Sequence, residues 1–249
     1  RPLIVGIGEV LWDMFPGESL FGGAPANFAA HSAAFGADVR MISAVGDDEL
    51  GRQALVALAD RGIPIEGIAI SDHPTGTVAV TLDEAGKADY VFANDTAWDN
   101  LAWNDDLAAL AARTDVVCFG TLGQRSEISR ATIVRFVKST PADSLRIFDV
   151  NLRQDFHSAD IIRESLELAN VLKLNDEELD TVIPDDGREV PDRLRSLLSN
   201  HDLQLVVYTR GEKGALLVAD GKAVDYQGIS VPVKDTVGAG DAFTAVVAH

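Results

Sequence analysis

The sequence predicts an α/β fold in which helices cover a mostly parallel sheet. Three observations predict it: short apolar runs alternate with helix-length segments, glycines close two of the early helical segments, and one β-rich pattern interrupts the alternation. Alternating strands and helices are typical of βαβ units with parallel strands. The chain has 249 residues, of which 47% are hydrophobic and 24% charged, so it can form one large domain or two small ones.

The amino-terminal part contains two strand–helix pairs. Apolar residues dominate both strands, and the two helices are followed by Gly36 and Gly62, a common signal for the carboxyl end of a helix. The predicted elements are a buried strand over residues 4–13 that ends on an acid, a helix over 26–35, a strand over 39–45 and a helix over 48–61.

A hairpin pattern follows in the middle of the chain. Residues 77–82 and 90–92 are rich in residues that favour strands, and residues 83–87 between them have turn composition. A hairpin inserted into an α/β chain suggests a small accessory sheet. An edge hairpin of the main sheet fits the pattern equally well.

The strand–helix alternation then resumes. Short apolar runs predict strands over residues 116–119, 146–150, 171–174 and 205–209, and helices are expected over 126–138, 161–168 and 190–198. Residues 241–249 favour a further helix that stops without a cap, and the sequence does not begin with methionine. We therefore expect the natural polypeptide to be longer.

Charge and cysteine content argue against several functional classes. A balance of 21 basic and 39 acidic residues gives a formal net charge of −18, which repels nucleic acids and anionic membranes. Amide dipoles and a metal cation can still hold a small phosphorylated ligand. No apolar run approaches the roughly 18 residues that a membrane helix needs. The single cysteine, Cys118, excludes an internal disulfide, and a cytoplasmic location is expected.

The strongest local signal is the segment 235–243, Asp-Thr-Val-Gly-Ala-Gly-Asp-Ala-Phe, which is followed by a helical pattern. Its two glycines allow a tight turn, and the free amides at a helix start attract an anion. The acid Asp241 would repel that anion, so its presence favours a role as acceptor of a proton from an attacking hydroxyl. An acid-capped helix after a glycine turn is the structural alternative.

Two other segments could bind a polyol. Residues 21–29 contain paired glycines that expose backbone, and Asn27 offers both a donor and an acceptor near a helix start. Residues 149–153 follow a strand, at the edge where ligands bind in open α/β sheets, and Arg153 could hold a sugar hydroxyl or a phosphate. A loop before a helix and a surface ion pair are the respective structural alternatives.

Two more segments could contact a metal or phosphate groups. Residues 175–178, Asn-Asp-Glu-Glu, follow a strand, and a carboxylate there could hold Mg²⁺ through water, although an acidic helix start is the commoner reason for such a pattern. Residues 209–214 are a glycine-bracketed turn that could lie against phosphates or form a plain hairpin turn.

Two common nucleotide-binding motifs are absent. Gly6-Ile7-Gly8 lacks the third glycine of the dinucleotide fingerprint, because Leu11 occupies that place. The Gly-Lys pairs at 86–87 and 221–222 are both followed by alanine, so no Walker A loop is present. An NAD-dependent oxidoreductase is therefore disfavoured.

Taken together, these segments resemble the ribokinase-like sugar kinases of the PfkB family. Residues 22–27, Gly-Gly-Ala-Pro-Ala-Asn, are similar to the amino-terminal signature of that family, and residues 235–243 to the more specific carboxyl-terminal one. Order and spacing agree over nearly the whole chain. The Ala-Pro pair and the Asn-Leu-Arg after a strand look most like fructokinases.

The resemblance implies a single domain over residues 1–249 with a ribokinase-like fold. Such a fold is a three-layer αβα arrangement around a mostly parallel central sheet, with a small β lid expected around residues 9–14 and 68–95. In the family, the chain continues past the last helix and there completes the adenine pocket and the cation site.

The resemblance also implies a role for each matching position. Catalysis would use Asp241 as general base on the sugar hydroxyl and Gly238, Ala239 and Gly240 as the anion hole. The sugar would be bound by Asp13, Gly22, Gly23, Asn27 and Arg153. ATP would be bound by Asn175, Thr209 and Gly211, Mg²⁺ through water by Glu178, and a monovalent cation, usually K⁺, by Asp235 and Thr236.

The implied activity is ATP-dependent phosphorylation of a hydroxyl of a small neutral sugar, with fructose favoured, Mg²⁺ as cofactor and K⁺ at the cation site. A kinase for 2-keto-3-deoxygluconate, ribose or a nucleoside is an alternative, as is a non-catalytic sugar-binding module on the same fold. No nucleic-acid or membrane partner is expected, and two copies could pair through the lid.

Overall fold

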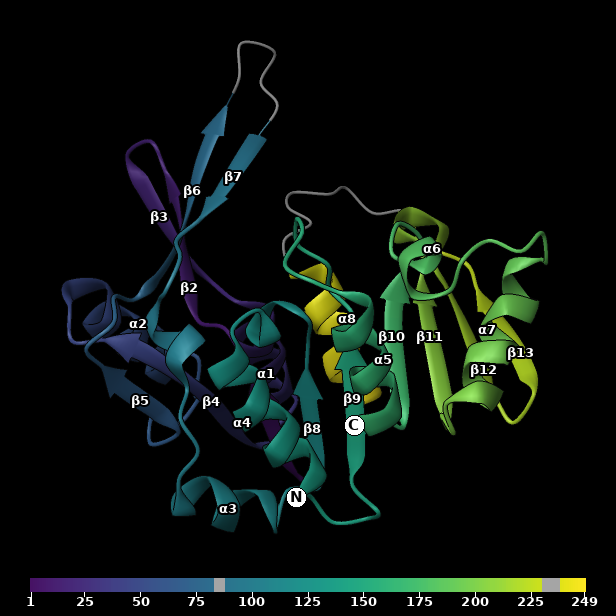
Figure 1. The fold of residues 1–249 in the computed structure, drawn as a ribbon, viewed down its shortest axis with the longest axis horizontal. Coiled ribbons are helices and arrows are strands. Elements are labelled where there is room, and N and C mark those ends of the chain that lie inside the picture. The colour runs from purple at the N-terminus through teal and green to yellow at the C-terminus, as the bar shows by residue number, and fades with distance from the viewer. Residues whose placement is uncertain (83–87, 230–237) are drawn as a thin grey trace.

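The computed structural model describes residues 1–82, 88–229 and 238–249 of the chain. Within these residues a nine-stranded sheet runs through the molecule in the order β13-β12-β11-β10-β9-β8-β1-β4-β5 (Figure 1). Its strands are β1 (Leu3–Ile7), β4 (Asp38–Gly46), β5 (Ile68–Ser71), β8 (Val116–Phe119), β9 (Leu145–Asp149), β10 (Val171–Asn175), β11 (Leu205–Thr209), β12 (Ala215–Ala219) and β13 (Lys222–Tyr226). Neighbouring strands from β5 to β11 are parallel, whereas β12 and β13 pair antiparallel.

Helices cover both faces of this sheet, which confirms the predicted three-layer αβα arrangement. Successive strand residues point to opposite faces. Val117 and Phe119 therefore belong to the apolar cluster on one face, which also contains residues of α3 (Asp105–Ala111), α4 (Glu127–Lys138), α5 (Ala159–Leu168) and α7 (Val190–Asn200). Val116 and Cys118 belong to the cluster on the other face, which contains residues of α1 (Ala24–Ala34), α2 (Glu49–Asp60) and α8 (Ala239–Val247). The short helix α6 (Leu179–Val182) follows β10.

Local sequence sets the ends of several helices. The Asp48 carboxylate accepts a hydrogen bond from the Gly51 amide and so caps α2. Ser158 caps α5 in the same way. Gly62 follows α2 with a φ of 75°, a backbone conformation that glycine adopts without strain.

A second, four-stranded sheet projects from the large one (Figure 1). It has the order β3-β2-β6-β7 and contains β2 (Leu11–Phe15), β3 (Glu18–Gly22), β6 (Gly76–Leu82) and β7 (Ala88–Phe92). The middle hairpin of the sequence therefore belongs to an accessory sheet rather than to an edge of the main sheet. We call these four strands the lid. The expected turn at 83–87 lies outside the described residues.

Two predicted boundaries were wrong. The single strand over residues 4–13 is divided, because the chain leaves the large sheet after Ile7 and enters the lid at Leu11. Gly8 has a φ of 145° at this break, which an apolar sequence pattern does not reveal. The lid was also expected to begin near residue 68, but β5 pairs with β4 at the edge of the large sheet, and the first lid residue of that segment is Gly76.

Among the described residues, every helix is too short or too polar to cross a lipid bilayer.

A buried ion pair joins three elements at the centre of the large sheet. Lys173 Nζ in β10 lies 2.9 Å from Asp149 Oδ1 in β9, and both side chains are 7% exposed. The Thr244 hydroxyl of α8 donates to Asp149 Oδ2 at 2.9 Å. Burial by itself would lower the pKa of Lys173, but the adjacent Asp149 carboxylate outweighs it, so the pKa is raised and the ammonium stays charged.

Replacing Lys173 with methionine tests the weight of this ion pair. We expect Lys173→Met to lower the free energy of unfolding by about 3–5 kcal/mol, because it leaves the Asp149 carboxylate buried without its counter-ion. Arg163→Met, which removes the exposed pair with Asp160, is the control and should cost less than about 1 kcal/mol. Equal losses in urea denaturation would show that the Lys173–Asp149 pair is no more important than a surface pair.

Candidate active site

Asp241 and Asn27 meet although they are 214 positions apart in the sequence. Asp241 lies in the first turn of α8, and Asn27 lies near the amino end of α1. The Asn27 Nδ2 donates to Asp241 Oδ2 at 2.9 Å. The two motifs that the sequence singled out most strongly therefore contribute to one site, and the amide fixes the orientation of the carboxylate.

The glycine bend before α8 lies beside this carboxylate. Gly238 is the residue before the helix and has a left-handed φ of 76°. A Cβ placed on it would lie 3.8 Å from Asn27 Nδ2 and 4.0 Å from Asp241 Oδ2. Among the described residues, no side chain caps the first amides of α8. These unpaired N–H groups carry the positive end of the helix dipole, so they can bind an anion.

The third residue of the bend, Gly240, packs against the buried ion pair. A Cβ on Gly240 would lie 3.1 Å from Lys173 Nζ, which is tighter than an ordinary contact. Glycine at this position therefore lets α8 approach β10 closely. The Thr244 hydroxyl, which also donates to the Gly240 carbonyl at 3.0 Å, holds the helix there through Asp149.

Burial raises the pKa of Asp241, and the nearby Asp149 carboxylate raises it further. The hydrogen bond from Asn27 and the charges of Lys173 and Arg153 oppose this rise. Asp241 is therefore a stronger base than an exposed aspartate, while the three opposing groups favour its ionised form.

The lid contributes Asp13 from β2 and Gly22 from β3. A Cβ on Gly22 would lie 3.2 Å from Asp13 Oδ2, so a larger residue would crowd this carboxylate. Burial raises the pKa of Asp13, and the charge of Arg153 opposes the rise. Gly23, the residue before α1, has a φ of 116°, and a Cβ there would lie 2.5 Å from the Glu9 carbonyl oxygen. Glycine is required at this junction between the lid and α1.

Arg153 is exposed and supplies positive charge to the site. Its Nη1 donates to the Leu152 carbonyl at 2.9 Å, and within the described part of the chain it forms no ion pair. Its charge lowers the pKa values of Glu9, Asp13 and Asp241, so it lies within electrostatic range of all three carboxyls. A free guanidinium facing several acids can bind a polar ligand without first breaking an ion pair.

Asn175 and Glu178 form a reciprocal pair after β10. The Asn175 Oδ1 accepts from the Glu178 amide at 2.9 Å, and Glu178 Oε2 accepts from the Asn175 amide at 2.8 Å. The second oxygen, Oε1, accepts from the Leu152 amide at 3.0 Å. Burial raises the pKa of Glu178. The carboxylate therefore ties the loop after β9 to the end of β10.

Glu178 retains the capacity to contact a metal-bound water. Each of its oxygens accepts one amide hydrogen bond and keeps a second lone pair. Mg²⁺ keeps several of its waters and needs few protein carboxylates when phosphates complete its coordination. No cluster of three or more potential metal ligands occurs among the residues that the structure describes. The donor set thus fits Mg²⁺ held through water, and it does not form a direct protein cage.

Thr209 lies opposite Asn175 in the register of β10 and β11, at the same edge of the sheet. Gly211 is in the turn between β11 and β12, with a φ of 55°. That turn joins two antiparallel strands, as a hairpin turn does. In the described structure no hydrogen bond joins either residue to Asp241. The predicted cation ligands Asp235 and Thr236 lie outside the described residues.

Sequence reasoning assigned no role to three buried charged residues: Glu9, Asp149 and Lys173. Glu9 is 2% exposed, and its Oε2 has no hydrogen-bond partner among the described residues. It lines a cavity of about 10 Å³, the size of one water, together with Asp149 and Asn151. Burial raises the pKa of Glu9 to about 7. The available signal was a single charge inside an apolar strand-like run, seen at both Glu9 and Lys173.

Comparisons with known proteins identify the family of the chain. The pfkB family of carbohydrate kinases matches residues 14–249. A sugar kinase of Pyrococcus horikoshii is 31% identical over 98% of this chain and 81% of its own length. The fructokinase of Salmonella typhimurium is 31% identical over 96% of this chain and 81% of its own length. The crystal structure of the P. horikoshii sugar kinase in complex with ATP has a TM-score of 0.81 at 29% identity, covering 98% of this chain and 83% of that one.

The pH dependence of folding stability tests the buried state of Glu9. The pKa of Glu9 is about 7 in the folded protein against an ordinary 4.5, so the folded state keeps a proton that the unfolded chain has lost. The contribution of Glu9 to stability therefore falls as pH rises from 4.5 to 7 and stays level above that. One pH unit corresponds to about 1.4 kcal/mol, so this window corresponds to about 3 kcal/mol.

We expect Glu9→Gln to remove this fall, because glutamine is neutral at every pH. Its unfolding free energy relative to wild type should rise by about 3 kcal/mol between pH 4.5 and values above 7. Glu167→Gln, at an exposed site in α5, is the control and should show no such trend. If Glu9→Gln and wild type give parallel stability curves in denaturant titrations, Glu9 is not protonated in the folded protein.

Proposed function

Because the chain belongs to the pfkB family of carbohydrate kinases, we propose that it transfers the γ-phosphoryl group of ATP to a hydroxyl of a small neutral sugar, with fructose favoured. One observation carries this proposal. The Asp241 carboxylate lies beside the glycine bend and the uncapped first amides of α8, oriented by Asn27. A base next to an anion-binding helix end is what an alcohol attacking a phosphate requires.

In the proposed reaction, Asp241 accepts the proton of the attacking sugar hydroxyl. An alcohol is a weak acid, but phosphoryl transfer passes through a loose transition state in which the proton can leave late. Asn27 keeps one carboxylate oxygen in place, and Asp13 and Arg153 hold the other hydroxyls of the sugar. Positioning of this kind and charge stabilisation supply the larger share of the rate enhancement.

The amides of Gly238, Ala239 and Gly240 would face the transferring phosphoryl oxygens. Their N–H groups are fixed by the helix and need no rearrangement as negative charge develops. Asn175, Thr209 and Gly211 would line the path of ATP along the strand ends. Glu178 would hold a water of the Mg²⁺ ion, and that ion, when bound with ATP, neutralises phosphate charge. A K⁺ site at Asp235 and Thr236 stays a prediction.

The charges of the site favour a neutral acceptor. Among the described side chains of the site, acidic ones outnumber basic ones, and Lys173 is already paired with Asp149. In that part of the chain Arg153 remains as the cation available to an acceptor. Related fructokinases from several organisms are about 30% identical to this chain, whereas a relative that acts on a sugar phosphate, an ATP-dependent 6-phosphofructokinase, is 25% identical. Kinases for ribose or a nucleoside remain neutral-acceptor alternatives.

A non-catalytic sugar-binding module is the alternative from another class. A buried carboxylate beside an anion-binding helix end is costly and serves no purpose in a pure binder, which supports catalysis.

A cytoplasmic location stays a prediction. It is consistent with Cys118, which is a buried free thiol. Pairing of two copies through the lid also stays a prediction, supported by the exposed Leu20, Tyr90 and Val91.

Asp241→Asn separates catalysis from binding. We expect kcat to fall roughly 10²–10⁴-fold, because the amide cannot accept the hydroxyl proton. Sugar affinity measured by calorimetry should stay close to wild type, since asparagine keeps the shape of the side chain. Asp106→Asn, an exposed change at the start of α3, is the control. Turnover within a few-fold of wild type in Asp241→Asn would remove Asp241 from the base role.

A panel of acceptors assayed for ADP formation tests the proposed substrate class. Two like charges about 6 Å apart repel by about 3 kcal/mol at an effective dielectric of 20, which corresponds to roughly 100-fold. We therefore expect kcat/KM for fructose to exceed that for fructose 6-phosphate and for 2-keto-3-deoxygluconate by roughly this factor. Preference for an anionic acceptor would contradict the neutral-sugar proposal. Preference for ribose or a nucleoside would contradict the assignment of fructose but not the proposal of a neutral acceptor.

A further inference from the structure

Arg125 lies outside the transfer site and is almost completely buried, with a side chain that is 7% exposed. It follows the short 3₁₀ helix η2 (Leu122–Gln124). Its Nε donates to Asp99 Oδ1 at 2.7 Å and its Nη2 to Asp99 Oδ2 at 2.6 Å, which forms a two-pronged ion pair. The Nη2 also donates to the Ala93 carbonyl at 2.5 Å.

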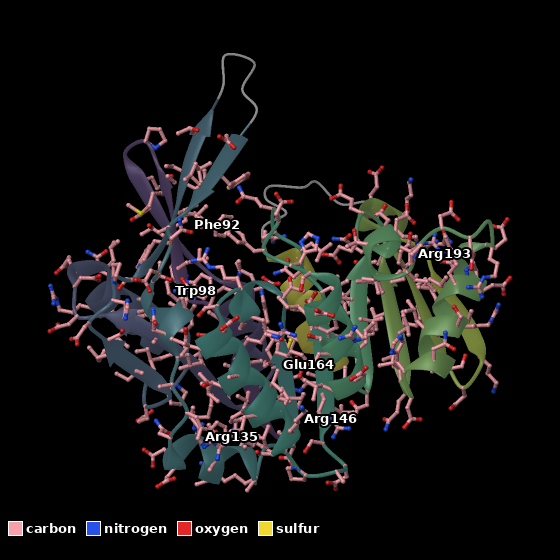
Figure 2. All side chains as sticks on the ribbon, viewed as in Figure 1. Phe92, Trp98, Arg135, Arg146, Glu164 and Arg193 are labelled. Carbon is pink, nitrogen blue, oxygen red and sulfur yellow. The ribbon has the colours of Figure 1, made fainter. Side chains whose placement is uncertain are left out.

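Two aromatic rings face the same guanidinium. Arg125 Cζ lies 4.2 Å from the ring centre of Trp98 and 4.9 Å from that of Phe156. Phe156 in turn meets Phe92 of β7 edge-on, with the ring centres 5.3 Å apart. Figure 2 shows Phe92 and Trp98 where the lid meets the large domain. We call Arg125, Asp99, Trp98 and Phe156 the Arg125 cluster.

The Arg125 cluster joins three segments that are distant in the sequence. The first segment runs from Ala93, which directly follows lid strand β7, to Trp98 and Asp99 in the 3₁₀ helix η1 (Ala97–Asn100). The second segment contains Arg125. Phe156 lies in the loop between β9 and α5, the loop that also carries Arg153. The Gln154 side chain of this loop donates to the Tyr90 carbonyl of β7. The loop thus contacts the lid at two points, and Arg125 contacts the Phe156 ring of one of them as well as the Ala93 carbonyl after β7.

We propose that Arg125 is a positioning residue that holds lid strand β7 and the Arg153 loop in one fixed relation, and so determines the affinity for the acceptor sugar. The sugar part of this inference rests on the proposed function, in which Arg153 from the loop and Asp13 from the lid bind the same molecule. The two side chains come from different segments. Their spacing is therefore set by whatever joins those segments.

Arginine is required for this arrangement. A guanidinium is planar and delocalised, so it can donate to Asp99 through its N–H groups and also pack against the rings of Trp98 and Phe156. An ammonium is a point charge without a flat face, and it cannot make both kinds of contact at once. Arg125→Lys therefore keeps the positive charge and removes the geometry.

Amide hydrogen exchange on the protein without ligand tests the joining of the segments directly. In Arg125→Lys we expect exchange to rise by about tenfold both in residues 88–93 and in residues 151–157, with the core of β8 and β9 unchanged. Phe156→Leu, which keeps the ion pair and removes the ring that contacts both Arg125 and Phe92, should raise exchange in the same two segments by a smaller factor. The Phe156→Leu variant keeps the proposal testable if Arg125→Lys fails to fold. Unchanged exchange in both variants would overturn the positioning role.

Steady-state kinetics tests the consequence for the acceptor. We expect Arg125→Lys to raise KM for fructose about tenfold, because the binding of the acceptor is weakened. KM for ATP should stay within about twofold of wild type. Arg130→Lys is the matched control: Arg130 pairs with Glu164, away from the lid in Figure 2, and should change neither value. Equal effects on both KM values would mean a general loss of structure. If wild type does not phosphorylate fructose, the assignment of fructose as acceptor fails, and hydrogen exchange still decides the role of Arg125.

Discussion

The Asp149 carboxylate is the contact on which the site depends, because it binds Lys173 of β10 and Thr244 of α8 at the same time. Without it, the contacts that hold α8 among the described residues would be apolar packing and the Asn27–Asp241 hydrogen bond to α1. With it, the first turn of α8 is held at the carboxyl ends of the strands, where open α/β sheets bind ligands. Gly240 lets the helix approach Lys173 closely, and Asp241 then reaches Asn27 of α1.

Several acids lie close together in this site, and each is stabilised differently. Asp149 has a buried counter-ion, Asp241 accepts a hydrogen bond from an amide, and Glu178 accepts two backbone hydrogen bonds. The Glu9 Oε2 has no hydrogen-bond partner among the described residues, and burial raises the pKa of Glu9 to about 7, so Glu9 carries a proton over much of the acid range. Because these acids lie close together, the acceptor side of the site is negative, which opposes anionic acceptors. The phosphates of ATP would instead face the positive end of the α8 dipole.

Much of the fold was predictable from local pattern, whereas the long-range contacts were not. The alternation of apolar runs and helices predicted the parallel sheet, and the glycine spacing in 235–243 predicted the bend before Asp241. The break at Gly8 was missed because a buried strand and two consecutive strands share one apolar pattern. The short polar strand β3 gave little signal. The contacts of Arg125 with Asp99 and Phe156 join three separate segments, and no spacing in one sequence records them.

The most direct measurement is a crystal structure of the protein with fructose and a non-hydrolysable ATP analogue. The account predicts one sugar hydroxyl within about 3.2 Å of an Asp241 carboxylate oxygen. It also predicts that the γ-phosphate lies against the amides of Gly238, Ala239 and Gly240. A sugar bound elsewhere, or an Asp241 carboxylate turned away from every sugar hydroxyl while the phosphates lie far from α8, would contradict it.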